Sequence, residues 1–355
     1  MQELEAAKYK GAYQITNGTL ANESIPTLTQ INGLLEFTEN SLSAKNVKAH
    51  AFGSPVAFNL SSGKDKVLRI SARGRITEDS LQQVFREQNI AKASQYITGS
   101  TDWLGDIIIQ KPHVNIAIRS DLSGITSHLP APFNKCQTQA FSLRVDKKQD
   151  ADTDTVTVNI NNLVNAKIIR TSNKGKMQFD SASIHFGDIT SVGNIASNAK
   201  GLQLTGALNY LDADAWRAVL SNLASSDKQT LNLPVQKLAL KINALDIFDR
   251  RLNQLTISNK TSRAGLLPAT QGMLVNVESR EINGDLQWIN QNNGKLIARL
   301  SSFTIPETAP DKISTATEAN TQSNSQFIKL EQDYPSLDII ADYFEFNKKN
   351  FGALE

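Results

Sequence analysis

The chain has little of the chemistry from which metal, redox or nucleic-acid sites are built. Its 355 residues include a single cysteine, Cys136, which excludes an intramolecular disulfide and a cysteine-based zinc site. The histidines, at positions 50, 113, 128 and 185, do not have the spacing of metal ligands. The 37 Lys and Arg residues nearly balance the 35 Asp and Glu residues, and the net charge of +2 gives no reason to expect a nucleic-acid partner.

Motifs for catalysis are also missing from the sequence. Neither a G-x-S-x-G motif nor a glycine-rich phosphate loop occurs. The acidic run DKKQDADTD at 146–154 resembles a calcium loop only superficially, because it lacks the glycine and the distal glutamate of such loops. We predict a charged hairpin tip there. The sequence therefore indicates a protein that is not an enzyme and has no catalytic, cofactor-binding or metal-binding residues.

Long apolar runs are absent as well. The sequence has no stretch of 18 or more apolar residues, so the chain has no transmembrane helix of its own. The N-terminal sequence MQELEAAKYKGAYQ lacks the apolar segment of a signal peptide. The closing FGALE follows directly on a strand pattern. We therefore expect a fragment of a longer protein.

The dominant pattern is an alternation of apolar and polar residues with period two. With 40% hydrophobic and 20% charged residues the composition is that of a folded protein, and the alternation predicts about fifteen strands. The clearest segments are 67–76, 112–122, 202–210 and 282–288. Asn17-Gly18 and Ser62-Gly63 are expected to form turns. Such strands form an antiparallel sheet with one apolar face and one wet face.

Two amphipathic helices interrupt the strands. The first is predicted near 78–89 with Thr77 as its N-cap, and the second near 212–225 with Asp212 as its N-cap. The segment 306–326 is rich in Thr, Ser, Asn and Gln and has almost no apolar residues, which predicts a flexible loop.

An internal similarity suggests that the sheet is elongated. Residues 238–255 and 337–354 align without gaps at an offset of 337 − 238 = 99, and each reads as a strand, a tight turn and a second strand. The alternative is a chance similarity among alternating strands. We divide the chain into a β segment at 1–135, a continuing β segment at 136–305, the loop at 306–326 and a β-hairpin at 327–355.

The apolar face of such a sheet has two possible uses. It could be a dry core, or an elongated and curled sheet could leave it open as a trough. The strands at 105–110 and 114–122 are the most apolar pair in the chain. The candidates for lining a trough are therefore Ile107, Ile109, Val114, Ile116 and Ile118. The same positions could instead pack under the helix at 78–89.

Several motifs resemble the YhdP branch of the AsmA/TamB superfamily in their order and spacing along the whole chain. They are GSTDW at 99–103, DLSGITSHLPAPF at 121–133, LTGALNYLDADAW at 204–216, INGDLQW at 282–288 and LIARLSSFTIP at 296–306. The resemblance identifies the chain as a fragment from the C-terminal half of such a protein.

The resemblance carries expectations for fold and function. Members of this superfamily are anchored in the inner membrane of Gram-negative bacteria, extend through the periplasm, and are long curled β-sheets with no catalytic residues. Their concave apolar face carries phospholipid acyl chains between the inner and outer membranes, which supports outer-membrane lipid homeostasis. We therefore expect a mainly β, elongated and curled antiparallel sheet with two short helices. Its partners would be phospholipid acyl chains, a membrane reached through an anchor outside this chain, and envelope proteins. The alternative function is a β scaffold or adaptor that binds envelope proteins and no lipid.

Overall fold

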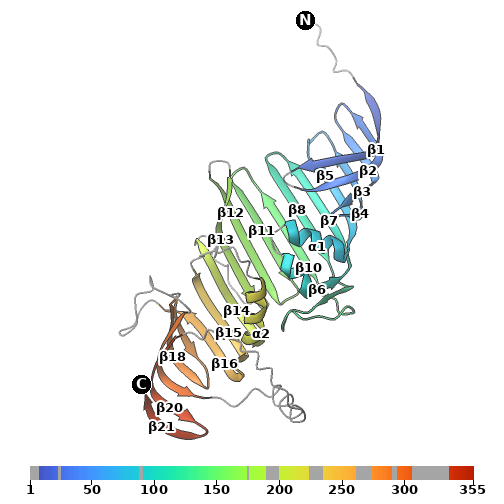
Figure 1. Cartoon of the computed structure of the whole chain (residues 1–355). Helices are drawn as coiled ribbons and strands as arrows, with labels where there is room; N and C mark the ends of the chain where they lie inside the picture. Colours follow the sequence, from blue (N-terminus) through green and yellow to red (C-terminus); the bar gives the residue numbers. More distant parts are fainter. Residues whose placement is uncertain are drawn as a thin grey trace, which may run out of the picture.

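The structure is a computed structural model that describes residues 8–22, 25–87, 91–173, 176–188, 200–223, 235–260, 273–289, 294–305 and 336–355. These residues form one sheet of 19 strands, with two α-helices, a 3-10 helix and a separate two-stranded ribbon beside it. The sheet is long and open, and β1 and β21 lie at its opposite ends (Figure 1). This confirms the predicted elongated, mainly β fold.

The elements follow one another along the sheet. The strands of its first half are β1 (Lys10–Asn22), β2 (Ile25–Thr38), β3 (Leu42–Ala51), β4 (Ser54–Ser62), β5 (Leu68–Ile76), β7 (Thr101–Gln110), β8 (His113–Ser120), β10 (Leu143–Gln149), β11 (Thr153–Ile160) and β12 (Val164–Asn173). The second half holds β13 (Lys176–Phe186), β14 (Gly201–Asp212), β15 (Val235–Ile247), β16 (Arg250–Asn259), β17 (Met273–Glu278), β18 (Ile282–Ile289), β19 (Lys295–Thr304), β20 (Ser336–Phe346) and β21 (Lys349–Leu354). The remaining elements are α1 (Glu78–Glu87), η1 (Ala91–Tyr96), α2 (Ala213–Leu223), and the ribbon strands β6 (Ile97–Gly99) and β9 (Ile125–Ser127).

Each strand of the sheet pairs with the next strand of the sheet along the chain, and most of these pairs are antiparallel, as predicted. The pairs β13–β14, β14–β15 and β19–β20 are parallel, so the sheet is mixed. A parallel pair needs a connection of a dozen residues or more, and these three connections span 187–200, 213–234 and 305–335. The pairing of β8 with β10 carries the sheet across position 135, where we divided the chain.

Both predicted helices form, and both begin at the predicted caps. The Ser80 backbone N–H donates to Thr77 Oγ1 at the start of α1, at 3.4 Å. At the start of α2 the Ala215 N–H donates to Asp212 Oδ1, at 2.8 Å. A cap of this kind satisfies a backbone donor that the first helical turn leaves without a partner.

The two similar segments both form hairpins, β15–β16 and β20–β21. Their turns have the same backbone form, with positive φ at Phe248 and Asp249 in one and at Asn347 and Lys348 in the other. In both cases the first strand of the hairpin is parallel to the strand before it. The predicted loop at 306–326 lies outside the described residues.

The expectation of a turn at Asn17-Gly18 was wrong. These residues lie inside β1, where Asn17 has φ of 51° and the register with β2 shifts between Ile15 and Gly18. The Asn-Gly pair therefore forms a β-bulge, which uses the same left-handed backbone conformation that a hairpin turn needs. A positive φ identifies the backbone conformation but does not say whether the chain reverses.

Candidate functional site

One face of the sheet is apolar across nearly its whole length. Following the register from strand to strand, side chains on the same face meet one another across sixteen strands, from β3 to β20. This line consists of Val47, Phe58, Ala72, Gly105, Ile118, Val145, Val158, Ala166, Ile184, Leu204, Leu238, Asn259, Val275, Leu286, Ala298 and Ile339. Gly105 contributes no side chain to this line. Its one polar member is Asn259, which lies one step beyond the Ala239–Ser258 pair and whose side-chain oxygen accepts from the Leu238 backbone N–H. We call this surface the apolar face.

The five residues proposed from the sequence as a lining lie together on the apolar face. Ile107 is opposite Ile116, Ile109 is opposite Val114, and Ile118 belongs to the line described above. All five side chains are half-buried. Among the described elements, helix α1 lies closest to η1. The alternative placement of these residues under that helix stays a prediction.

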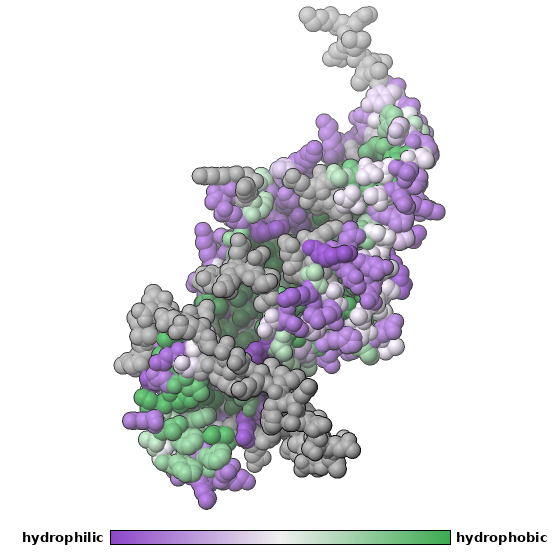
Figure 2. Space-filling view, in the orientation of Figure 1, coloured by the Kyte–Doolittle hydropathy of each residue, from purple (hydrophilic) through white to green (hydrophobic). Residues whose placement is uncertain are grey.

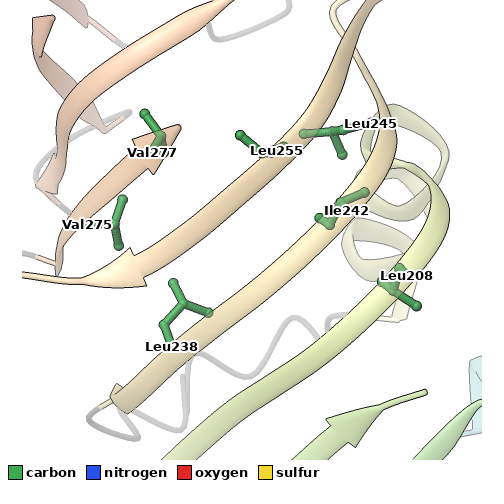
Figure 3. Packing of buried hydrophobic residues seen from close by; sticks show 7 residues of the cluster. All are labelled: Leu208, Leu238, Ile242, Leu245, Leu255, Val275 and Val277. Carbon is green, nitrogen blue, oxygen red and sulfur yellow. The ribbon is translucent and has the colours of Figure 1, made fainter. Parts of the chain in front are cut away.

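The exposure of the apolar face changes along the sheet. In the second half Leu208, Ile242 and Leu255 belong to a dry cluster, and Ile242 is only 2% exposed (Figure 3). Among the described strands of the large sheet from β5 to β13, which leaves out the ribbon strands β6 and β9, Val164 is the one buried apolar side chain, and Ile168 is 38% exposed. Figure 2 shows a hollow with apolar side chains over this middle part. We call the apolar face of β5 to β13 the trough.

The opposite face of the same strands is mainly polar, although Leu104 and Ile108 of β7 are exposed on it. Asp106 lies in an ion pair with Arg119 at 3.3 Å, and Arg144 binds Asp146 at 2.6 Å. Further along, hydrogen bonds from Arg299 and then Lys295 lower the pKa of Asp338 below its usual value. The strands therefore separate an apolar surface from a charged one, as the period-two pattern predicted.

Chemistry of other kinds is sparse in the part of the chain that the structure describes. Within it, no group of three or more His, Cys, Asp or Glu side chains is placed to hold a metal ion. Likewise, the described helices include none that is long and apolar enough to cross a membrane. His185 is buried and its Nδ1 lies 3.0 Å from Thr205 Oγ1, whereas the exposed His113 pairs with Asp150 at 2.6 Å.

The family model for the YhdP protein matches residues 1–355, which is the whole chain. The chain belongs to the YhdP family. A curated relative is the intermembrane phospholipid transporter YhdP of Escherichia coli (strain K12), which is 22% identical over 307 residues. The alignment covers 83% of this chain but only 23% of the relative, so the chain spans about a quarter of that protein's length. No solved structure matches the chain.

In this YhdP-family chain residues 121–142 form a folded segment that pairs with β6 through β9 and contacts helix α2. Its anchor is Lys135, whose buried ammonium donates to the carbonyl oxygens of Leu122, Ile125 and Cys136 at 2.9, 2.6 and 3.2 Å. Burial lowers the pKa of this lysine. No pattern in the sequence predicts this role, because a lysine that donates only to backbone oxygens has no partner residue to predict.

Helix α2 is fixed to the same segment rather than to the sheet alone. The Trp216 indole Nε1–H donates to the Ala131 carbonyl oxygen at 3.1 Å, and its ring meets Phe133 edge-on with centroids 5.7 Å apart. The Asn222 amide also donates to the Tyr96 hydroxyl of η1, at 3.2 Å. These contacts join two of the motifs that carry the family resemblance, 121–133 and 204–216.

Sequence reasoning missed one group of residues on the apolar face. Lys147, Asp154 and Arg170 lie there among apolar neighbours: Lys147 is opposite Ile116 and Val156, and Asp154 is opposite Arg170. The run at 146–154 does form the tip of the β10–β11 hairpin, as predicted. However, Asp154 shares the parity of Val156, so its side chain points to the apolar face rather than to solvent.

Proposed function

We propose that this chain is a segment of a periplasmic protein that binds phospholipid acyl chains in the trough and conducts them along the sheet. The observation that carries the proposal is the line of apolar side chains that crosses sixteen strands without a charged residue. Neighbouring strands are about 4.8 Å apart, so the whole line is about 70 Å long, and the open trough from β5 to β13 makes up six of its spacings, or about 30 Å. A dry core does not require a single line of this length, because core clusters need only pack locally.

The energetics of acyl transfer favour such a surface. Each CH₂ group exposed to water costs about 0.8 kcal/mol, so a sixteen-carbon chain moving through water faces a barrier on the order of 12 kcal/mol. The half-buried Ile116 and the exposed Ile168 offer apolar contact while leaving the surface open from above. The polar headgroups can remain in solvent at the rim of the trough.

The wider setting of the proposal rests on the family. The E. coli relative is named an intermembrane phospholipid transporter, which supports lipid transport as the activity of this chain's parent protein. We propose that the parent protein is anchored in the inner membrane by a segment outside this chain and spans the periplasm toward the outer membrane. We also propose that the chain is not an enzyme and that envelope proteins contact the assembly.

Site-specific photocross-linking tests the trough directly. A photoreactive phenylalanine analogue at position 116 or 168 should form adducts with co-purified or added phospholipid. The matched controls are positions 115 and 167, which neighbour them in sequence but lie on the polar face. We expect lipid adducts at the first pair of positions and none at the second. Equal labelling of both faces, or protein adducts without lipid at 116 and 168, would instead support the scaffold alternative.

A further inference from the structure

The trough holds three charged side chains near one rim. Lys147, Asp154 and Arg170 come from β10, β11 and β12, and their register places them on the same face as Ile116 and Ile118. Arg170 Nη2 donates to Asp154 Oδ2, and Lys147 Nζ lies 3.9 Å from the same oxygen. The cluster therefore carries two positive charges and one negative charge inside an otherwise apolar surface.

The bonding of Asp154 is incomplete. Both cations approach Oδ2, and the second oxygen, Oδ1, is buried without a hydrogen-bond partner among the described residues. Asp154 is only 3% exposed. By contrast, the buried Asp285 binds Lys260 through both of its oxygens, at 2.9 and 3.1 Å. A buried carboxylate oxygen without a donor is costly, so an ordinary structural ion pair does not account for this geometry.

The cations remain within reach of a ligand. The side chain of Arg170 is 42% exposed and that of Lys147 is 24% exposed. Around them lie exposed apolar groups, since Ile168 is two residues from Arg170 and Phe179 is its partner on β13. The β10–β11 turn, closed by the Asp150 N–H bond to the Thr153 carbonyl oxygen at 2.8 Å, begins directly beyond the cluster. The cluster thus lies where an apolar surface meets water.

We propose that Lys147, Asp154 and Arg170 form a headgroup site in the trough that selects phosphoethanolamine lipids. The phosphate group binds the two cations, drawing Arg170 away from Asp154, and the primary ammonium group donates to the carboxylate, including Oδ1. This inference rests on the proposed function, because the acyl chains of the same lipid occupy the neighbouring apolar surface.

The donor chemistry separates this headgroup from its relatives. A choline group carries a positive charge but has no N–H to donate, so Oδ1 stays without a partner. A glycerol headgroup supplies the phosphate but no cation, so it leaves the charge of the Asp154 carboxylate without a positive partner from the ligand. Only a zwitterion with a protonated amine satisfies the two cations and both carboxylate oxygens.

The test measures uptake and selectivity separately. The 355-residue chain is incubated with vesicles that contain equal amounts of phosphatidylethanolamine, phosphatidylcholine, phosphatidylglycerol and diacylglycerol, all with the same acyl chains. Bound lipids are then quantified by mass spectrometry. We expect phosphatidylethanolamine to be enriched at least about threefold over the other two phospholipids, as one additional charge-assisted hydrogen bond at a partly exposed site would produce.

Two variants identify the residues responsible. Asp154→Asn should abolish the enrichment while total lipid uptake is unchanged. Arg170→Gln should reduce the uptake of all three phospholipids but not of diacylglycerol, which lacks the phosphate. The matched control is Asp146→Asn, because Asp146 pairs with Arg144 on the polar face. It should behave as the unmodified chain.

The outcomes distinguish the site from the trough. Uptake of all lipids without any headgroup preference, or enrichment that survives Asp154→Asn, would overturn the headgroup site and leave the trough intact. Failure to take up any of the four lipids, diacylglycerol included, would overturn the proposed function itself. A rise in melting temperature with soluble phosphoethanolamine, without enrichment of the lipid, would assign the cluster to a free small molecule and overturn its role in lipid selection.

Discussion

A carboxylate at position 116 separates an open trough from a dry core. Ile116 is half-buried, and its neighbours across the sheet are Ile107 and Lys147. Burying an isoleucine fully is worth about 1.5–3 kcal/mol, so Ile116→Asp loses roughly half of that. A cross-strand pair between the new carboxylate and the partly buried Lys147 returns about 0.2–1 kcal/mol of this stability. We therefore expect a net loss of about 0.5 kcal/mol in the free energy of unfolding, because water reaches the new carboxylate.

The matched variant is Ile242→Asp, on the same face but in the dry cluster, where the native side chain is 2% exposed. There the new carboxylate has no access to water, and the cost rises to several kcal/mol, comparable to the stability of a whole domain. Urea unfolding followed by circular dichroism measures both variants, and lipid extraction measures their bound phospholipid. Ile116→Asp should stay folded and bind less lipid. Aggregation of both variants would show that Ile116 lies in a dry core. If Ile116→Asp stays folded and binds as much phospholipid as the unmodified chain, Ile116 does not line the trough.

Three further outcomes follow from individual contacts. Burial and then the hydrogen bond to Asp246 raise the pKa of Tyr210 to about 12. The pKa of an unfolded tyrosine is about 10, so the protonated Tyr210 hydroxyl stabilises the folded chain fully below pH 10, and this stabilisation is lost between pH 10 and 12. Tyr210→Phe should weaken the fall of the melting temperature between pH 10 and 12. An unchanged dependence of the melting temperature on pH would contradict the assignment. Asp212→Ala should cost about 1 kcal/mol through the lost helix cap, measurable by urea unfolding, whereas Asp212→Asn should retain most of it. Gly206→Ala should lower the free energy of unfolding by at least about 2 kcal/mol in the same assay, because φ is +116° and the new Cβ would lie 2.0 Å from a carbonyl oxygen of β13. The control Gly63→Ala should be near neutral, because its new Cβ meets nothing closer than 3.7 Å.

Much of the fold could be predicted from local patterns, because its determinants are local. Alternation with period two places side chains on alternate faces whatever the neighbouring strands are, so the apolar face of β8 is correct down to Val114, Ile116 and Ile118. Helix caps act within one turn, and Thr77 and Asp212 cap the helices as predicted. The parallel pairs could not be predicted in this way, since strand direction depends on the connections and leaves the alternation unchanged.

The charged cluster in the trough lay within reach of the same reasoning. Counting back in steps of two from Ile160, through Val158 and Val156, leads to Asp154, and the alternation alone places it on the apolar face. The acidic composition of the run at 146–154 concealed this parity. Its pairing with Arg170 depends on the register of β11 with β12, which a single sequence does not reveal.

The distribution of dry clusters explains how a sheet can keep one face open and still fold. An apolar surface that stays exposed contributes little to stability, and the strands that carry it need support from elsewhere. Here the support flanks the trough: one cluster gathers around Val47 in β2 to β4, a second around Ile242 in β14 to β17, and a third around Ala341 in β18 to β20. The strands β5 to β13 are held between these clusters by continuous backbone pairing, which does not depend on what covers their side chains. Substitutions that weaken the flanking clusters should therefore unfold the chain, whereas substitutions within the trough should change what it binds.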